Sequence, residues 1–394
     1  MTRRPAASFA LFAYGFRPYF LIAGAWVVLA VGIWIAALHG APLPDGPLPM
    51  QRWHGHEMIA GFIGAAMCGF LLTAIPSWTG RRGYAGGPLV VLTLLFIAAR
   101  LVLLPGSPLP ASLAALIALL PLPALLAWVL PALVKAGTMR LFGPPALVLV
   151  FWLGDLLMLG DAAGWWAGTF ETGTRLSLNG ALALVGLIGG RIVPSFTLSA
   201  LRRKGLAPGP IPFPAIDIAG QAALLGVVLV DLAVPDGVAS GLVAALAAPL
   251  VLARLARWRG LETLDSPILW VLHLAYLFVP LALATKAAFL LAGGSWAAAW
   301  LHMQSIGAIG LMILAVMTRA TLGHTGRDLV APPACVVAFV LVPLAALVRV
   351  VGVGLLAPMV ALGIAATLLM VAFALFVVSL GGALVMARVD GKPG

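Results

Sequence analysis

Six histidines are the residues of this 394-residue chain best suited to metal chemistry, and most of them stand in or beside long apolar stretches. They are His39, His54, His56, His273, His302 and His324. A neutral imidazole nitrogen is the commonest metal ligand, and ionisable groups at membrane depth usually serve a function. We therefore treat all of them as candidate metal ligands except His39, which lies in a loop. The alternative for each is a structural histidine, solvated at the membrane surface or bonded to a neighbouring helix.

His54 and His56 stand two positions apart at the start of an apolar stretch. Two helical positions turn a side chain by about 200°, so a regular helix cannot direct both imidazoles to one metal. Either the pair precedes the helix, with a bend at Gly55, or the two histidines serve different sites. Glu57 is expected to accept a hydrogen bond from an imidazole N–H, or to place a favourable charge at a helix N-terminus.

The stretch that begins at His56 recurs later in the chain. Residues 302–327 match residues 56–81 without a gap, at an offset of 246 positions (302 − 56 and 327 − 81). A weaker third copy places residues 193–197 on residues 75–79. Such self-similarity indicates a repeated structural unit. We predict one membrane domain over 1–394, built from three parallel four-helix repeats at 1–143, 144–265 and 266–394.

The repeat suggests what its histidines and arginines bind. It puts His56 and His302 at one depth on two different helices, where they could hold opposite faces of a haem or bind a copper ion. Arg191 and Arg319 share one repeat position in the inner half of their helices. We expect these two arginines to hold haem propionates, pair with acids or line a polar path.

The remaining two histidines point to a separate location. His324 follows His302 by 22 residues, which is about 33 Å along a helix, so one haem cannot bind both. His273 is expected about one third of the way into its span from the cytoplasmic face. His273 and His324 therefore form a second metal site or make structural contacts on that side.

Composition identifies an integral membrane protein. Hydrophobic residues make up 63% of the chain and charged residues 9%, whereas soluble domains carry about 25% charged residues. The apolar runs are continuous, which excludes an outer-membrane barrel. The net charge of +11 does not indicate nucleic-acid binding, because the basic residues lie in short loops on alternate sides. Cys68 and Cys335 form no CxxC pair, so a disulfide framework or iron–sulfur site is not expected.

Twelve segments are long enough to cross the bilayer. We expect them at 18–38, 57–78, 88–104, 110–134, 144–166, 176–200, 214–234, 238–253, 266–292, 297–320, 331–349 and 358–386. With the N-terminus inside, 17 Lys and Arg residues fall on the cytoplasmic side and 3 on the other. This asymmetry predicts a multi-pass protein of the bacterial inner (cytoplasmic) membrane with both termini cytoplasmic.

Several charged residues are expected within these spans. Arg100 is predicted to be buried, and Asp155 to be a proton relay or a salt-bridge partner. Lys286 is expected to extend to the outer interface. An alternative function, a secondary transporter without haem, would line its path with Asp155, Arg100 and Arg191. The four-span parallel repeat is not the inverted or six-span arrangement typical of transporters.

Five long motifs resemble the NnrS family, and the resemblance covers nearly the whole chain. They lie at 16–20 (FRPYF), 53–58 (WHGHEM), 69–81 (GFLLTAIPSWTGR), 268–277 (ILWVLHLAYL) and 302–327. The resemblance implies a bacterial inner-membrane protein with haem, of the b type, and copper, linked to nitric oxide metabolism and resistance to nitrosative stress. It carries the family's histidine motifs onto His54, His56, His273, His302 and His324, and leaves open which bind haem and which copper.

The predicted architecture is also similar to the catalytic subunits of haem–copper oxidases and nitric oxide reductases. This chain departs from them because its sixth and seventh spans contain no histidine, so the copper ligands of those enzymes are absent. No Walker, GxGxxG, HExxH or GxSxG motif occurs, which argues against a nucleotide-driven or hydrolytic enzyme. Three functions remain open: redox conversion or binding of nitric oxide, sensing of nitric oxide by a scaffold, and transport.

Overall fold

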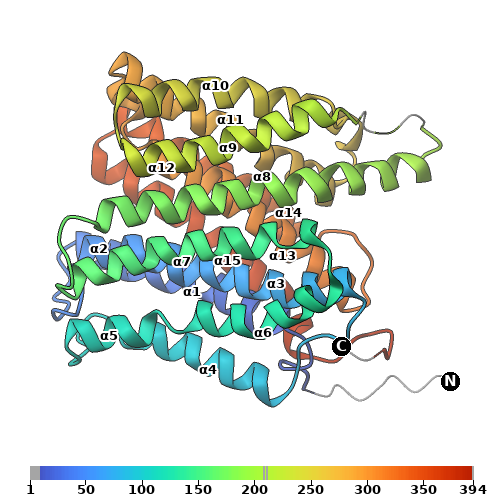
Figure 1. Ribbon diagram of the computed structural model, residues 1–394, viewed down its shortest axis with the longest axis horizontal. Coiled ribbons are helices and arrows are strands. Elements are labelled where there is room, and N and C mark those ends of the chain that lie inside the picture. The colour runs from blue at the N-terminus through green and yellow to red at the C-terminus, as the bar shows by residue number, and fades with distance from the viewer. Residues whose placement is uncertain (1–8, 207–208, 210–211, 393–394) are drawn as a thin grey trace. The chain divides into compact units, whose positions relative to one another are not determined.

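The computed structural model describes residues 9–206, 209 and 212–392 and consists of helices joined by short connections (Figure 1). Within these ranges, eleven helical segments are long and apolar enough to cross a membrane. The predicted span 88–104 is a shorter apolar helix, α4 (Gly87–Leu101). The β pairing among these residues is a single isolated bridge between Phe9 and Met386. The prediction of an all-α, multi-pass membrane protein is confirmed.

The chain forms two compact units. The first comprises residues 1–174, 317–335 and 373–394, and the second comprises residues 175–316 and 336–372. Helices that lie wholly in the first unit are α1 (Phe16–Leu38), α2 (Met50–His56), α3 (Gly64–Thr79), α4, α5 (Ala111–Ala118), α6 (Pro121–Ala136) and α7 (Gly143–Ala162). Helices that lie wholly in the second are α9 (Pro214–Ala233), α10 (Val238–Ala256), α11 (Pro267–Ala292) and α12 (Trp300–His302). The three-repeat organisation stays a prediction.

Four further helices begin in one unit and end in the other. They are α8 (Phe170–Arg203), α13 (Leu311–His324), α14 (Pro333–Val350) and α15 (Pro358–Val385). Several helices are bounded by residues that favour such ends. Pro267 opens α11, where its missing N–H costs no hydrogen bond. Gly80 and Gly293 close α3 and α11 with positive φ angles of 65° and 64°, a conformation that glycine adopts without steric cost.

Two wide π-helical turns follow the two best-matched repeat histidines. The π-helix η1 (Glu57–Ile63) begins directly after His56, and η5 (Met303–Gly310) begins directly after His302. The starts of the two turns are therefore at equivalent repeat positions. π-Helical turns are rare and occur frequently at functional sites. Each turn joins a short helix to a long one, so that Met50–Thr79 and Trp300–His324 are continuous spans.

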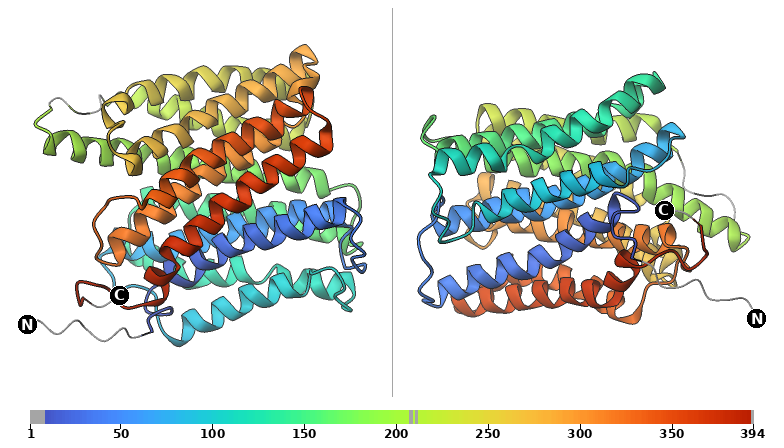
Figure 2. Two further views of the ribbon diagram at one scale, coloured as in Figure 1. Left: turned by 180° about the vertical axis from the view of Figure 1, so that it is seen from behind. Right: turned by 90° about the horizontal axis from the view of Figure 1, so that it is seen from below.

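In the first unit the chain's first helix lies beside the C-terminal half of its last helix. Figure 2 shows α1 and this part of α15 side by side in both views. Gly24 permits the approach, because a Cβ there would lie 2.8 Å from Val377 Cγ2. Arg17, with no exposed surface, donates from one guanidinium nitrogen to the carbonyls of Ala383, Leu384 and Met386. These bonds satisfy carbonyls at the end of α15 that lack partners within the helix.

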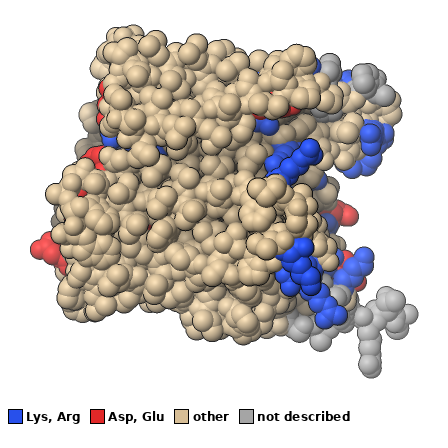
Figure 3. All heavy atoms as spheres, in the orientation of Figure 1, with Lys and Arg blue, Asp and Glu red and all other residues tan. Residues whose placement is uncertain are grey.

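On the face shown in Figure 3, few charged side chains lie along the sides of the helices. The Lys and Arg residues on this face lie mainly near the helix ends. The broad uncharged surface between these ends in Figure 3 fits a lipid environment, because hydrocarbon cannot solvate a charge. The inner-membrane location and the cytoplasmic termini stay predictions.

Candidate functional site

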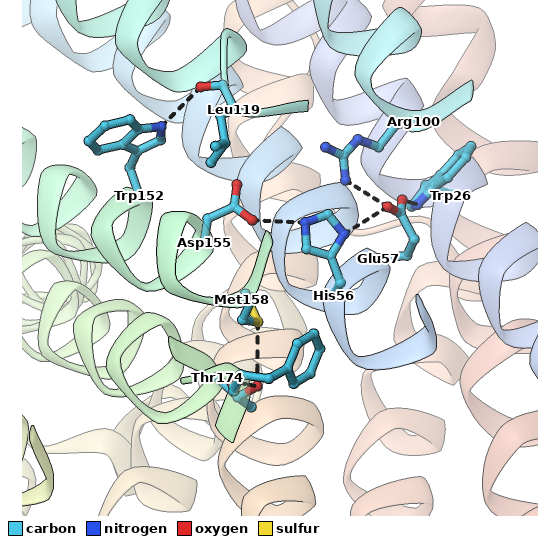
Figure 4. Close-up of polar contacts among 10 residues, drawn as sticks. Trp26, His56, Glu57, Arg100, Leu119, Trp152, Asp155, Met158 and Thr174 are labelled. Carbon is cyan, nitrogen blue, oxygen red and sulfur yellow. Dashed lines mark hydrogen bonds and ion pairs between the residues drawn. The ribbon is translucent and has the colours of Figure 1, made fainter. Parts of the chain in front are cut away.

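His56 is the centre of a buried polar network in the first unit (Figure 4). Its Nδ1 lies 3.0 Å from Glu57 Oε1, and its Nε2 lies 2.8 Å from Asp155 Oδ1. His56 and Glu57 have no exposed surface, and Asp155 is 2% exposed. Two ionised carboxylates are acceptors only, so this arrangement fits an imidazolium that donates both of its N–H groups.

Glu57 is the most highly bonded member of the network. Its Oε1 also accepts from Arg100 at 2.9 Å, and its Oε2 accepts from the Trp26 indole at 2.9 Å. The prediction that Glu57 accepts a hydrogen bond from an imidazole is confirmed. Arg100 and Asp155, which the transporter alternative places along a path, are both bound within the network, and that alternative stays a prediction.

Four segments of the first unit position this network. Trp26 comes from α1, His56 and Glu57 from the junction of α2 and η1, Arg100 from α4, and Asp155 from α7. Figure 4 shows Glu57 and Asp155 on two sides of the imidazole, with Arg100 and Trp26 directed at the Glu57 carboxylate. The guanidinium of Arg100 also lies over the Phe96 ring, 5.4 Å from its centroid. Two acids and two bases in one apolar region balance in charge, which is the condition for burying them.

His54 has different surroundings from His56. Its ring stacks on Trp34 with centroids 4.9 Å apart and planes 12° apart. Both histidines lie in α2, so the chain does not bend at Gly55 to bring them together. Of the two alternatives that helix geometry left open, this arrangement favours separate surroundings for the two histidines.

His324 ends α13 on an aromatic platform in the first unit. The centroid of its ring lies 5.8 Å from that of the Tyr14 ring and 5.5 Å from that of the Phe16 ring. Its carbonyl accepts from Arg388 at 2.7 Å. Arg388 also pairs with Asp390 and lowers the pKa of that carboxyl to about 2. These contacts support the structural interpretation of His324 and leave its metal ligation a prediction.

His273 on α11 has one bonded and one unbonded ring nitrogen. The Thr197 hydroxyl donates to the Val193 carbonyl at 2.9 Å and therefore accepts from His273 Nε2–H at 2.9 Å. The Nδ1 atom is buried without a hydrogen-bond partner, and the residue is 8% exposed. A hydrogen bond that fixes one imidazole nitrogen and leaves the lone pair of the other available is typical of metal-binding histidines.

Gly260 packs closely against this nitrogen. A Cβ at position 260 would lie 2.6 Å from His273 Nδ1, nearer than side-chain carbons come to other atoms. We expect Gly260→Ala to displace the imidazole and lower the free energy of unfolding by about 1–3 kcal/mol. Thermal unfolding in detergent measures this, with Gly363→Ala as the control, because a Cβ there meets nothing within 4 Å. Equal unfolding temperatures for the two variants would contradict the expectation.

The histidines differ in how well they fit a metal. His56 does not fit in this arrangement, because both of its nitrogens bond carboxylates. His273 does fit, because its Nδ1 is buried without a hydrogen-bond partner and so has a lone pair available. Across the described ranges, no group of three or more His, Cys, Asp or Glu side chains is close enough to hold an ion. A metal bound to His273 would therefore have few other His, Cys, Asp or Glu ligands from the described residues.

The other predicted cofactor residues are distributed over both units. His302 is half-buried at the end of α12 and belongs to the second unit. Arg191 is exposed on α8 in the second unit, and Arg319 is half-buried on α13 in the first. Their roles toward haem stay predictions.

A second buried charged network, in the second unit, was not predicted. Lys286 is 1% exposed and pairs with Asp231, so the expectation that it extends to the outer interface is wrong. Asp231 also accepts from Asn179 and Ser240, and Asn179 accepts from Gln304. The five side chains come from α8, α9, α10, α11 and η5. The sequence feature that could have predicted this network is the presence of Asp231 and Lys286 within apolar spans, because charged residues inside the membrane usually pair.

A known family model matches this chain. The model of the family described as "NnrS protein" matches residues 10–388. No curated protein matches the chain. The match takes in all the motifs noted above and the residues of both buried networks. Because it covers nearly the whole sequence, the chain belongs to the NnrS family.

Proposed function

We propose that this protein binds haem and copper through histidines within the membrane and uses them to bind or convert nitric oxide, thereby relieving nitrosative stress. The observation that carries the proposal is the family match over residues 10–388, because membership associates the protein broadly with nitric oxide. The buried nitrogen of His273 supports the metal-binding part, because it has the lone pair that a metal needs.

The chain's own residues would prepare the metal ligands. Thr197 holds the Nε2–H of His273, which keeps the lone pair on Nδ1. We assign metal binding to His273 and His302 and leave the choice between haem and copper to experiment. A bound haem iron or copper would supply a coordination position for nitric oxide and a means of electron transfer. Nitric oxide is a small apolar gas that enters a bilayer without a polar path.

The test is a visible spectrum of the detergent-purified protein, oxidised and reduced, with and without nitric oxide, together with iron and copper analysis. We expect a haem band that shifts with nitric oxide. Replacing His273 or His302 by alanine should each remove most of one metal, because the other ligands are few. His39→Ala is the matched control, since His39 is an exposed loop histidine whose ring bonds only the Ile35 carbonyl among the contacts described.

A colourless wild-type protein, expressed with ample haem and copper, would contradict the proposal. Full metal content in both His273→Ala and His302→Ala would contradict the ligand assignment. Consumption of nitric oxide over many turnovers would favour conversion over sensing. Reporter fusions at each terminus test the proposed inner-membrane orientation, and an external reporter at either end would contradict it.

A further inference from the structure

We infer that His56 is a clamp that holds two buried carboxylates from different helices, and that it is not a metal ligand in this protein. The inference rests on the proposed function only where it concerns metal content. The structural part concerns the first unit alone and stands on the contacts around the His56 ring.

The first step is the use of the imidazole nitrogens. A metal-bound histidine gives one nitrogen to the metal and uses the other in a hydrogen bond. His56 has carboxylate oxygens at 3.0 Å from Nδ1 and at 2.8 Å from Nε2. Figure 4 shows the ring held between Glu57 and Asp155. A metal could bind only after one of these bonds had broken, which would leave a buried carboxylate without that partner.

The second step concerns charge and burial. Glu57 keeps Arg100 and Trp26 as partners if His56 is removed. The ion pair described for Asp155 is the one with His56, and it links α7 to the α2–η1 junction. The side chain of His56 has no exposed surface and that of Asp155 is 3% exposed. Removing the cation beside a carboxylate as buried as this one is strongly destabilising, because water cannot take the place of the cation.

The third step is the comparison with the second copy of the repeat. The position equivalent to Glu57 is Met303, which cannot supply a carboxylate to the adjacent histidine. The two repeat histidines therefore differ in the group that the next residue offers, although both precede a π-helix. The repeat keeps the backbone turn and changes the residue after the histidine, so the Glu57 contact of the clamp is particular to the first copy.

The experiment is a double-mutant cycle on the full-length protein. We compare wild type, His56→Gln, Asp155→Asn and the double variant, measuring unfolding temperature together with iron and copper per protein. His56→Gln should lower the unfolding temperature by about 5–10 °C, because it leaves Asp155 without its cation. The double variant should return to within about 3 °C of wild type, since an amide pair needs no counter-charge. Its metal content should equal that of wild type.

Two results would overturn the inference. One is additive losses of unfolding temperature in the double variant, since contacting partners in a clamp must couple. The other is loss of iron or copper from a double variant that has recovered its stability. If the wild type itself holds no metal, the proposed function fails, and the temperature cycle alone still decides whether His56 is a clamp.

Discussion

Replacing Lys286 by methionine should lower the free energy of unfolding by about 3–5 kcal/mol, because it leaves a buried carboxylate without its cation. Lys286 and Asp231 are 1% and 2% exposed. The ammonium of Lys286 also lies 4.9 Å from the centre of the Trp300 ring. Methionine keeps the length and apolar character of the lysine stem, so the loss reports on the charge. Thermal or denaturant unfolding in detergent measures it.

The matched control is Lys135→Met, because Lys135 is an exposed lysine in α6. It should change stability by less than about 0.5 kcal/mol. The compensating variant Asp231→Asn with Lys286→Met should recover most of the loss. An asparagine at 231 keeps an oxygen that can accept from Asn179 and Ser240, which now bond Asp231. A double variant no more stable than Lys286→Met would contradict this explanation.

Arg17→Met is expected to lower the free energy of unfolding by about 2–4 kcal/mol. The guanidinium has no exposed surface and bonds three carbonyls near the end of α15, at 3.1, 3.1 and 2.7 Å. Hydrogen bonds to charged groups contribute about 1.5–3 kcal/mol each, and their losses overlap when one donor serves several acceptors. Amide hydrogen exchange should become faster in the last turn of α15, because its carbonyls lose their cap.

Arg81→Met is the control for Arg17, because Arg81 is exposed in the loop after α3. Arg17→Lys should restore part of the stability, since an ammonium can still donate to these carbonyls. If Arg17→Met and Arg81→Met unfold at the same temperature, Arg17 does not stabilise the contact between α1 and α15.

The number and type of the membrane-spanning elements could largely be predicted, because segments that cross the hydrocarbon core must be composed mainly of apolar residues. Long apolar runs must be helices, since a helix satisfies its own backbone in lipid. The one predicted span that fell short is 88–104, where α4 ends at Leu101 after 15 residues. The π-helices were not predicted, because one extra residue per turn leaves little trace in an apolar sequence.

The candidate site was only partly predictable. Helix periodicity left two arrangements open for His54 and His56, and the structure favours separate surroundings because both lie on α2. Periodicity could not identify Asp155 as the partner of His56, 99 positions away. The expectation that Lys286 extends to the outer interface is wrong for another reason. A lysine near a helix end extends to water only when no buried acid is closer.

The sequence by itself determined that this is an apolar, helical, multi-pass protein of the NnrS family, with a histidine repeated ahead of two similar spans. Those properties depend on composition, local periodicity and motif, all of which can be read along the chain. Only the tertiary structure decided which charges meet, as Lys286 and Asp231 do, and which histidine nitrogens are occupied. The physical reason is that a buried charge must find a partner, while helix packing determines which residue that partner is.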